Sequence, residues 1–256
     1  MSQNGSNQQG QTQTMRAVMT LRDLVVRGSL DPEQRYTETQ LAELLSMSRT
    51  PIRAAVQRLT DEGLLTPMPG GGYAVRQFSP VEISEAIELR GLLEGLCAGL
   101  LAERGLAADL LAGLSALSDQ IAAVLAVDDF GPAGLAEYER LNARLHHQLV
   151  IATDSTLLIQ EVARANNRPF ASASALVGLH RSHAEARLHL LIGQDHHRIV
   201  IEAIRNRQAG RAEAVMREHA RLSQQNLMRS FAGDAGLQAL RGASLIHHPD
   251  PGRIRA

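Results

Sequence analysis

The sequence predicts a mainly α-helical protein with two domains, a short helical domain that ends in a small β-hairpin and a C-terminal all-α bundle of six or seven helices. Two observations carry this prediction. Helical apolar spacing followed by a glycine-containing hairpin pattern occupies residues 15–78, and helical spacing alone continues through residues 79–232. Residues 1–14 and 233–256 lack periodicity, so we expect a disordered N-terminal tail and a flexible C-terminal tail.

The N-terminal domain is predicted to begin with two helices. Residues 19–30 place Leu21, Leu24 and Val25 on one side of a first helix. Thr37 then starts a second helix of about two turns, because Thr37-Glu38-Thr39-Gln40 has the form of a capping box. Leu41, Leu44 and Leu45 give this second helix an apolar face.

A third helix follows the turn Ser46-Met47-Ser48, and its first turn is rich in hydroxyl groups and positive charge. Arg49 and Arg53 are four residues apart and therefore share one face of the helix. Pro51 is tolerated in the first turn, where the N–H groups have no intrahelical partner. Free N–H groups and the positive end of the helix dipole favour phosphate oxygens, so this helix start is suited to DNA.

The segment after the third helix predicts a wing. Residues 64–67 and 73–75 are two short strand patterns around the glycines at positions 70–72. The order helix, helix, turn, helix, hairpin is that of a winged helix-turn-helix, in which the third helix contacts base edges and phosphates. The same fold used only for protein contacts remains an alternative.

Composition limits the class of protein. The 256 residues carry a net charge of -1, and all 26 basic residues are arginine. Without lysine, Walker-type phosphate binding and Schiff-base chemistry are excluded. Because the chain is not basic overall, affinity for nucleic acid must come from locally clustered arginines, and a dimer is the usual way to strengthen such binding.

Neither a membrane span nor a signal peptide is apparent in the sequence. No apolar run approaches the length of a membrane span, and the Gln/Asn/Ser-rich N-terminus does not resemble a signal peptide. We therefore expect a cytoplasmic protein without a membrane partner. Cys97 is the single cysteine, which excludes an intrachain disulfide and a multi-cysteine zinc site, and its apolar surroundings favour a packed thiol.

The C-terminal domain begins where Ser79-Pro80-Val81-Glu82 combines an N-cap serine, a first-turn proline and an early glutamate. Helical spacing then predicts an all-α bundle. The predicted helices cover residues 81–100, 110–127, 135–151, 156–179, 183–191, 195–208 and 211–231.

Four polar residues share the phase of the apolar stripes in this bundle. Asn142 and His146 are four apart on one helix, and His197 and His219 lie on the inward stripes of two others. Three imidazoles and an amide oxygen can thus converge, and imidazole suits Zn, Ni, Cu or Fe. The alternative is that each is a buried histidine satisfied by a backbone carbonyl or by water. The histidines at 180, 183 and 189 favour solvated or supporting roles.

With both halves considered, the chain resembles the GntR superfamily of bacterial transcription regulators, and within it the FadR subfamily with a C-terminal FCD domain. The resemblance covers about residues 16–231 and is most specific over residues 41–65. It implies that Arg49 and Arg53 contact operator bases, that Arg35 contacts the DNA backbone and that the wing enters the minor groove. The implied DNA-binding residues are Arg35, Thr37, Ser48, Arg49, Thr50, Arg53, Gly71 and Gly72.

In the C-terminal half, Glu88-Leu89-Arg90 followed by Glu94 resembles the first helix of the effector domain. The resemblance implies a divalent metal, Zn or Ni, held by Asn142, His146, His197 and His219, and a small carboxylate effector paired with Arg90. Asn142 stands where many relatives have aspartate, which removes a negative charge from the site, and Ser155-Thr156 replaces a usual Asn-Pro pair.

The resemblance further implies a homodimer that binds a palindromic double-stranded operator as a ligand-responsive repressor, without enzymatic activity. Two alternatives use the same histidines. One is a metal-dependent hydrolase, and the other is a regulator for which the metal itself is the signal.

Overall fold

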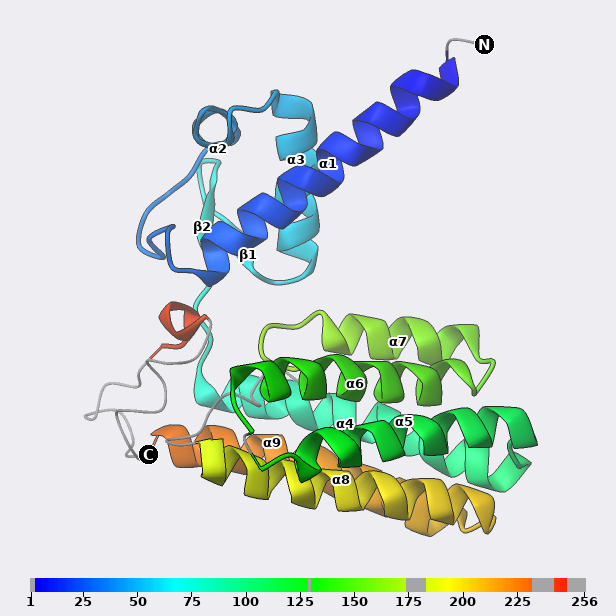
Figure 1. Cartoon of the computed structure of the whole chain (residues 1–256). Helices are drawn as coiled ribbons and strands as arrows, with labels where there is room; N and C mark the ends of the chain where they lie inside the picture. The colour runs from blue at the N-terminus through cyan, green and yellow to red at the C-terminus, as the bar shows by residue number, and fades with distance from the viewer. Residues whose placement is uncertain (1–2, 129, 174–182, 232–241, 248–256) are drawn as a thin grey trace. The chain divides into compact units, whose positions relative to one another are not determined.

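The computed structural model describes residues 3–128, 130–173, 183–231 and 242–247 (Figure 1). The chain forms two compact units, one of residues 1–80 with 241–256 and the other of residues 81–240. Helices dominate both, and the small sheet has only two strands. The predicted mainly α fold with a hairpin wing is therefore confirmed.

The first unit is a winged helix-turn-helix whose core lies between its helices. Its elements are α1 (Gln3–Val26), α2 (Glu38–Leu45), α3 (Arg49–Asp61), β1 (Leu65–Pro67) and β2 (Tyr73–Val75). The two strands are antiparallel, with Leu65 opposite Val75. Leu21 of α1 packs with the apolar stripe of α3, and Leu21, Ile52 and Leu59 are fully buried. We expected the first helix from residue 19 and no regular structure in residues 1–14, whereas α1 begins at Gln3.

The turn between α2 and α3 is fixed by local hydrogen bonds. Thr37 accepts from the backbone N–H of Gln40 at 3.2 Å, and the Gln40 side chain accepts from the backbone N–H of Thr37 at 2.8 Å, so the predicted capping box is present. α2 ends at Ser46, which adopts the left-handed conformation with φ of 52°. This sharp C-cap turns the chain so that α3 starts within three residues.

Residues 242–247, near the end of the chain, belong to the first unit. A short 3₁₀ helix (Ala243–Leu245) leads into Ile246, and Leu245 and Ile246 are 2% and 3% exposed. The backbone N–H of Phe78 donates to the Leu245 carbonyl oxygen at 2.7 Å, and that of His247 donates to the Phe78 carbonyl oxygen at 2.9 Å. We expected a flexible tail from residue 233, but the described residues 242–247 pair in parallel with Phe78 and add to the core of this unit.

The second unit is a bundle of long helices. Its described helices are α4 (Pro80–Arg104), α5 (Ala108–Ala126), α6 (Pro132–Ile151), α7 (Thr156–Asn166), α8 (His183–Arg205) and α9 (Ala209–Phe231). Two helices, over residues 183–191 and 195–208, were predicted where α8 runs without a break from His183 to Arg205. Gly193 lies inside this helix, where a Cβ would meet the ring of His219 in ordinary van der Waals contact at 3.4 Å. The helix predicted to reach residue 179 ends at Asn166, and residues 174–179 lie outside the described part.

α5 bears on the expectation that no segment spans a membrane. It is the one helix in the described ranges that is long and apolar enough to cross a bilayer, with a mean hydropathy of 1.3. A single helix of this kind is weak evidence for a span. Leu114, Leu117, Ile121 and Leu125 of α5 are buried in the bundle, where the helix packs against α6 and α8. A core helix of a bundle has this composition for the same reason that a membrane helix does, namely the burial of apolar side chains.

Candidate DNA-binding surface and candidate metal centre

The start of α3 presents polar groups on the surface of the first unit. Ser48 is the N-cap, it is exposed, and its side chain makes no capping hydrogen bond. The side chains of Arg49 and Arg53 are 63% and 66% exposed, and Thr50 is exposed beside them. All four residues predicted at the start of this helix are therefore accessible, while the opposite face of α3 is buried in the core.

Glu38, which the sequence did not single out, holds these arginines. Nε of Arg53 donates to both carboxylate oxygens of Glu38, at 3.1 and 3.0 Å, and Nη2 of Arg49 lies 3.8 Å from Oε2. The hydrogen bond from Arg53 lowers the pKa of Glu38 below its ordinary value. The acid thus occupies, at the surface, guanidinium groups of the kind that can pair with a phosphate. Its position in the first turn of α2, next to a capping threonine, was the available signal.

The wing tip and Arg35 form one surface. Gly70, Gly71 and Gly72 have φ values of 80°, 94° and 78°, a region that favours glycine. Nη2 of Arg35 donates to the Gly70 carbonyl oxygen at 2.7 Å, and a Cβ on Gly72 would lie 2.8 Å from Nε of Arg35. The glycines therefore let Arg35 lie against the tip of the wing. Thr37, also predicted to bind DNA, uses its hydroxyl in the cap of α2.

In the second unit, the structure brings together the three predicted histidines from three helices. His146 of α6, His197 of α8 and His219 of α9 are 4%, 1% and 8% exposed. One ring nitrogen of each lies within 4.8 Å of the others, and the ring centroids of His197 and His219 are 4.4 Å apart. Asn142, one turn before His146 on α6, is also buried. A set of neutral nitrogen ligands at this separation is suited to a divalent cation such as Zn²⁺ or Ni²⁺.

Two further residues contact the histidines. Oε2 of Glu94 on α4 lies 3.1 Å from Nδ1 of His146, and Oε1 of Gln194 on α8 lies 3.2 Å from Nδ1 of His197. Glu94 also accepts from Nη1 of Arg90 at 3.0 Å. Arg90, the predicted effector contact, is fully buried in this ion pair, so an acid reaches it only if the surrounding side chains move. The sequence resemblance placed Glu94 on the first helix of the effector domain but gave it no role.

The electrostatics of the cluster fit metal ligation. Burial, followed by the influence of His146 and neighbouring cationic groups, holds the pKa values of His197 and His219 well below their ordinary values. Both rings are therefore neutral near pH 7 and keep a lone pair for a ligand bond. Nδ1 of His219 is buried and has no hydrogen-bond partner among the described residues. A buried nitrogen of this kind is costly unless something binds it.

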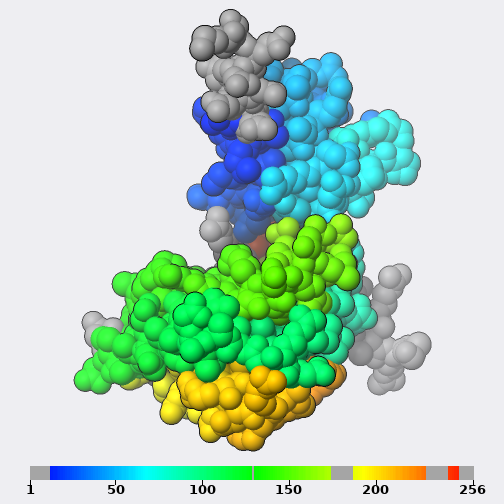
Figure 2. Space-filling model, turned by 90° about the vertical axis from the view of Figure 1, so that its right-hand side faces the viewer, coloured from blue at the N-terminus to red at the C-terminus, as the bar shows by residue number. Residues whose placement is uncertain are grey.

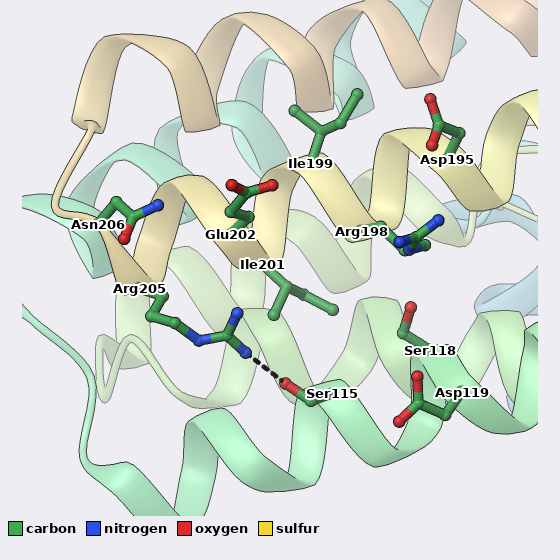
Figure 3. Close-up of a pocket in the computed structure, with 10 residues that line it drawn as sticks. All are labelled: Ser115, Ser118, Asp119, Asp195, Arg198, Ile199, Ile201, Glu202, Arg205 and Asn206. Atoms are coloured by element: carbon green, nitrogen blue, oxygen red, sulfur yellow. Dashed lines mark hydrogen bonds between the residues drawn. The ribbon is translucent and has the colours of Figure 1, made fainter.

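Two cavities lie in this unit. A cavity of about 30 Å³ beside His219 is lined by Tyr138, His189, Ser223 and Asn226 together with apolar residues, and is large enough for about one water molecule. A larger open groove of about 520 Å³ runs between α5 and α8 (Figure 3). Figure 3 shows acidic and basic side chains along this groove, where Arg205 donates to Ser115 at 3.1 Å. Figure 2 shows the same bundle in space-filling form, with α8 and α9 in yellow to orange beside the green helices.

Comparison with protein families gives two matches. The family model described as the FCD domain matches residues 85–222, and the model described as bacterial regulatory proteins, gntR family, matches residues 13–75. The first match covers the helices that carry the histidines, and the second covers the winged helix-turn-helix.

Individual relatives are transcription regulators. The Nta operon transcriptional regulator of Aminobacter aminovorans is 29% identical over 137 residues, which cover 54% of this chain and 62% of that protein. An uncharacterized HTH-type transcriptional regulator of Agrobacterium vitis is 34% identical over 34% of this chain and 50% of its own length. The chain thus matches less than two thirds of either protein. The HTH-type transcriptional repressor GlaR of Escherichia coli is 24% identical over 78% of this chain and 88% of its own length.

Solved structures share the fold. Escherichia coli McbR/YncC aligns with a TM-score of 0.58 at 21% identity, over 86% of this chain and 97% of that chain. Lar, which controls the expression of the Listeria monocytogenes agr system, aligns with a TM-score of 0.60 at 15% identity, over 84% of this chain and 96% of that chain.

Proposed function

Because the chain belongs to the GntR family of bacterial transcription regulators and its C-terminal half is an FCD domain, we propose that it is a ligand-responsive repressor whose effector is a small organic acid bound at or near a metal. The observation that carries this proposal is the buried cluster of His146, His197 and His219 in the effector-binding unit. Relatives and fold belong to transcription regulators rather than to enzymes. Membership of the FadR subfamily agrees with the FCD domain.

On the DNA side, we propose that a cytoplasmic homodimer places two α3 helices about 34 Å apart, one DNA turn, on a palindromic operator. The exposed Arg49 and Arg53 support this, since arginine is the side chain best suited to bidentate contact with guanine. Ser48 and Thr50 then bind phosphate or base edges, while Arg35, Gly71 and Gly72 bring the wing to the minor groove. Repression, rather than activation, is supported by the repressor among the relatives.

On the effector side, the residues proposed to hold the cation are Asn142, His146, His197 and His219. Bound there, a divalent cation supplies positive charge and open coordination positions for a carboxylate. The chain's own contribution is the small cavity beside His219 and the buried guanidinium of Arg90, which can pair an anion once it is reached. Acid binding then favours one arrangement of the units over another and changes operator affinity.

One experiment tests this function. Zinc-loaded and chelator-treated protein is screened by thermal shift against small carboxylates, and the hits are added to a gel shift on DNA upstream of the protein's own gene. We expect at least one acid to stabilise only the metal-loaded protein and to change its DNA affinity. Salt-independent or absent DNA binding would contradict the regulator assignment, because phosphate contacts make binding salt-dependent.

The two alternatives predict different results in the same assays. A metal-dependent hydrolase turns over esters or amides when zinc is added, whereas we expect no turnover. A metal-sensing regulator changes its DNA affinity with chelator alone, whereas we expect the organic acid to be required.

A further inference from the structure

The tautomer of His197 is set by hydrogen bonds that begin at the backbone of α5. Nε2 of Gln194 donates to the carbonyl oxygen of Ser118 at 2.7 Å and to its hydroxyl at 2.8 Å. Because a carbonyl oxygen only accepts, the amide nitrogen of Gln194 must face Ser118 and its Oε1 must face His197. Oε1 lies 3.2 Å from Nδ1 of His197. Nδ1 of His197 therefore carries the proton, and Nε2 carries the lone pair.

His146 has an acceptor on the equivalent side of its ring. Nδ1 of His146 lies 3.1 Å from Oε2 of Glu94, within ion-pair distance but without the geometry of a hydrogen bond. Glu94 is buried beside Arg90, whose Nη1 lies 3.0 Å from the same Oε2, and this buried ion pair keeps the Glu94 carboxylate ionised. An ionised carboxylate only accepts, so the proton of a neutral His146 belongs on Nδ1 and the lone pair on Nε2.

These two assignments create a conflict that a cation resolves. Nε2 of His146 and Nε2 of His197 lie 3.3 Å apart, and both rings are almost completely buried. With both protons on Nδ1, no hydrogen lies between the two nitrogens, and two lone pairs face each other. A metal ion accepts both lone pairs, whereas a purely structural histidine pair would be arranged with one N–H donating to the other ring.

From this geometry we propose that Glu94 and Gln194 are positioning residues, which set the tautomers of His146 and His197 and hold both Nε2 atoms ready for one divalent cation. The inference rests on the metal site of the proposed function and adds two residues that touch the ligands rather than the ion. Acceptors of this kind fix ring orientation and raise ligand basicity. Through Ser118, the arrangement also ties the site to α5, which carries no ligand itself.

The first test needs no metal. Long-range ¹⁵N–¹H NMR spectra of the full chain, kept in chelator, report which ring nitrogen of each histidine is protonated. We expect Nδ1–H for both His146 and His197 in the wild type, and a loss of that preference at His197 in Gln194→Met. Protonation of Nε2 on either ring of the wild type would overturn the proposal, whether or not the protein binds metal.

The second test measures Zn²⁺ affinity by competition with a chromophoric chelator. We expect Gln194→Met and Glu94→Gln each to weaken Zn²⁺ binding by about 10- to 100-fold. Glu85→Gln and Gln225→Met replace exposed residues of the same types and should leave the affinity unchanged. If Glu94→Gln fails to fold because Arg90 loses its counter-charge, Gln194→Met, which leaves no charge unpaired, carries the test.

The outcomes separate the two proposals. A wild type that binds Zn²⁺ while both variants bind it equally well overturns the positioning role and leaves the metal site standing. A wild type that does not bind Zn²⁺ overturns the metal site, and with it the use proposed for the two acceptors.

Discussion

The surface proposed to face DNA and the histidine cluster differ in how they present polar groups. Arg49 and Arg53 are 63% and 66% exposed and share one acid, whereas His146, His197 and His219 are at most 8% exposed. Exposed pairs are screened by water and salt, so long side chains exchange partners easily. A buried ring cannot, because each nitrogen left without a partner is costly. Surface substitutions should therefore change binding alone, while interior ones change binding and stability together.

The largest effect is expected in the core of the DNA-binding unit, away from its DNA-facing side chains. Leu245→Ala removes a side chain that is 2% exposed and should lower the free energy of unfolding by about 2–5 kcal/mol. Hydrogen exchange at the amides of Phe78 and His247, which donate across this contact, measures the loss. Leu44→Ala, at a leucine that is 56% exposed, is the control. Unchanged protection in Leu245→Ala would show that residues 242–247 do not belong to this core.

The second-largest effect is expected at the proposed metal site. Zn²⁺ at 100 times its dissociation constant should stabilise the protein by about 2.7 kcal/mol, because it binds only the folded state. His197→Leu should abolish this stabilisation, and His147→Leu, at the exposed neighbour of His146, should not. Chemical denaturation with zinc or with chelator provides the comparison. Equal zinc stabilisation of His197→Leu and wild type would remove His197 from the site.

Sequence periodicity was sufficient for the parts of the molecule that depend on local patterns. The capping box at Thr37 and the inward phase of His146, His197 and His219 follow from spacing along single helices, and the structure brings the three rings together. The break predicted between residues 191 and 195 is absent, because α8 continues through Gly193.

Contacts between distant segments could not be predicted in this way. Leu245 pairs with Phe78 across 167 residues, and the backbone carbonyl of Ser118 orients Gln194 across 76. Neither pair has a pattern within one element, since a backbone carbonyl is present at every residue. The role of Glu38 could not be predicted for the same reason, because its partner Arg53 lies on the next helix.

The third prediction separates base recognition from backbone contact. Arg49→Ala should cost about 1–3 kcal/mol of discrimination between operator and random DNA, whereas Arg35→Ala should weaken binding to both similarly and reduce the salt dependence. Fluorescence anisotropy on the two DNAs at several salt concentrations measures this. Neither variant should change thermal stability appreciably, since both side chains are exposed. Equal losses on both DNAs for Arg49→Ala would contradict its assignment as a base contact.

The smallest effect is expected at Glu38, and it tests the difference between the exposed arginines and the buried histidines. Glu38→Gln removes the charge that holds Arg53 and a negative charge that phosphates must approach, so operator affinity should rise modestly at low salt. The gain should shrink as salt increases, because exposed ion pairs are screened. Glu43→Gln, at an exposed position on the same helix, is the matched control for net charge. If both variants bind DNA equally tightly, the effect is one of overall charge, and Glu38 does not compete with DNA for the arginines. If only Glu38→Gln binds more tightly, Glu38 restrains the exposed arginines and DNA displaces it. The proposed metal site differs in this respect, because Glu94 and Gln194 stay in contact with the histidines when the cation binds.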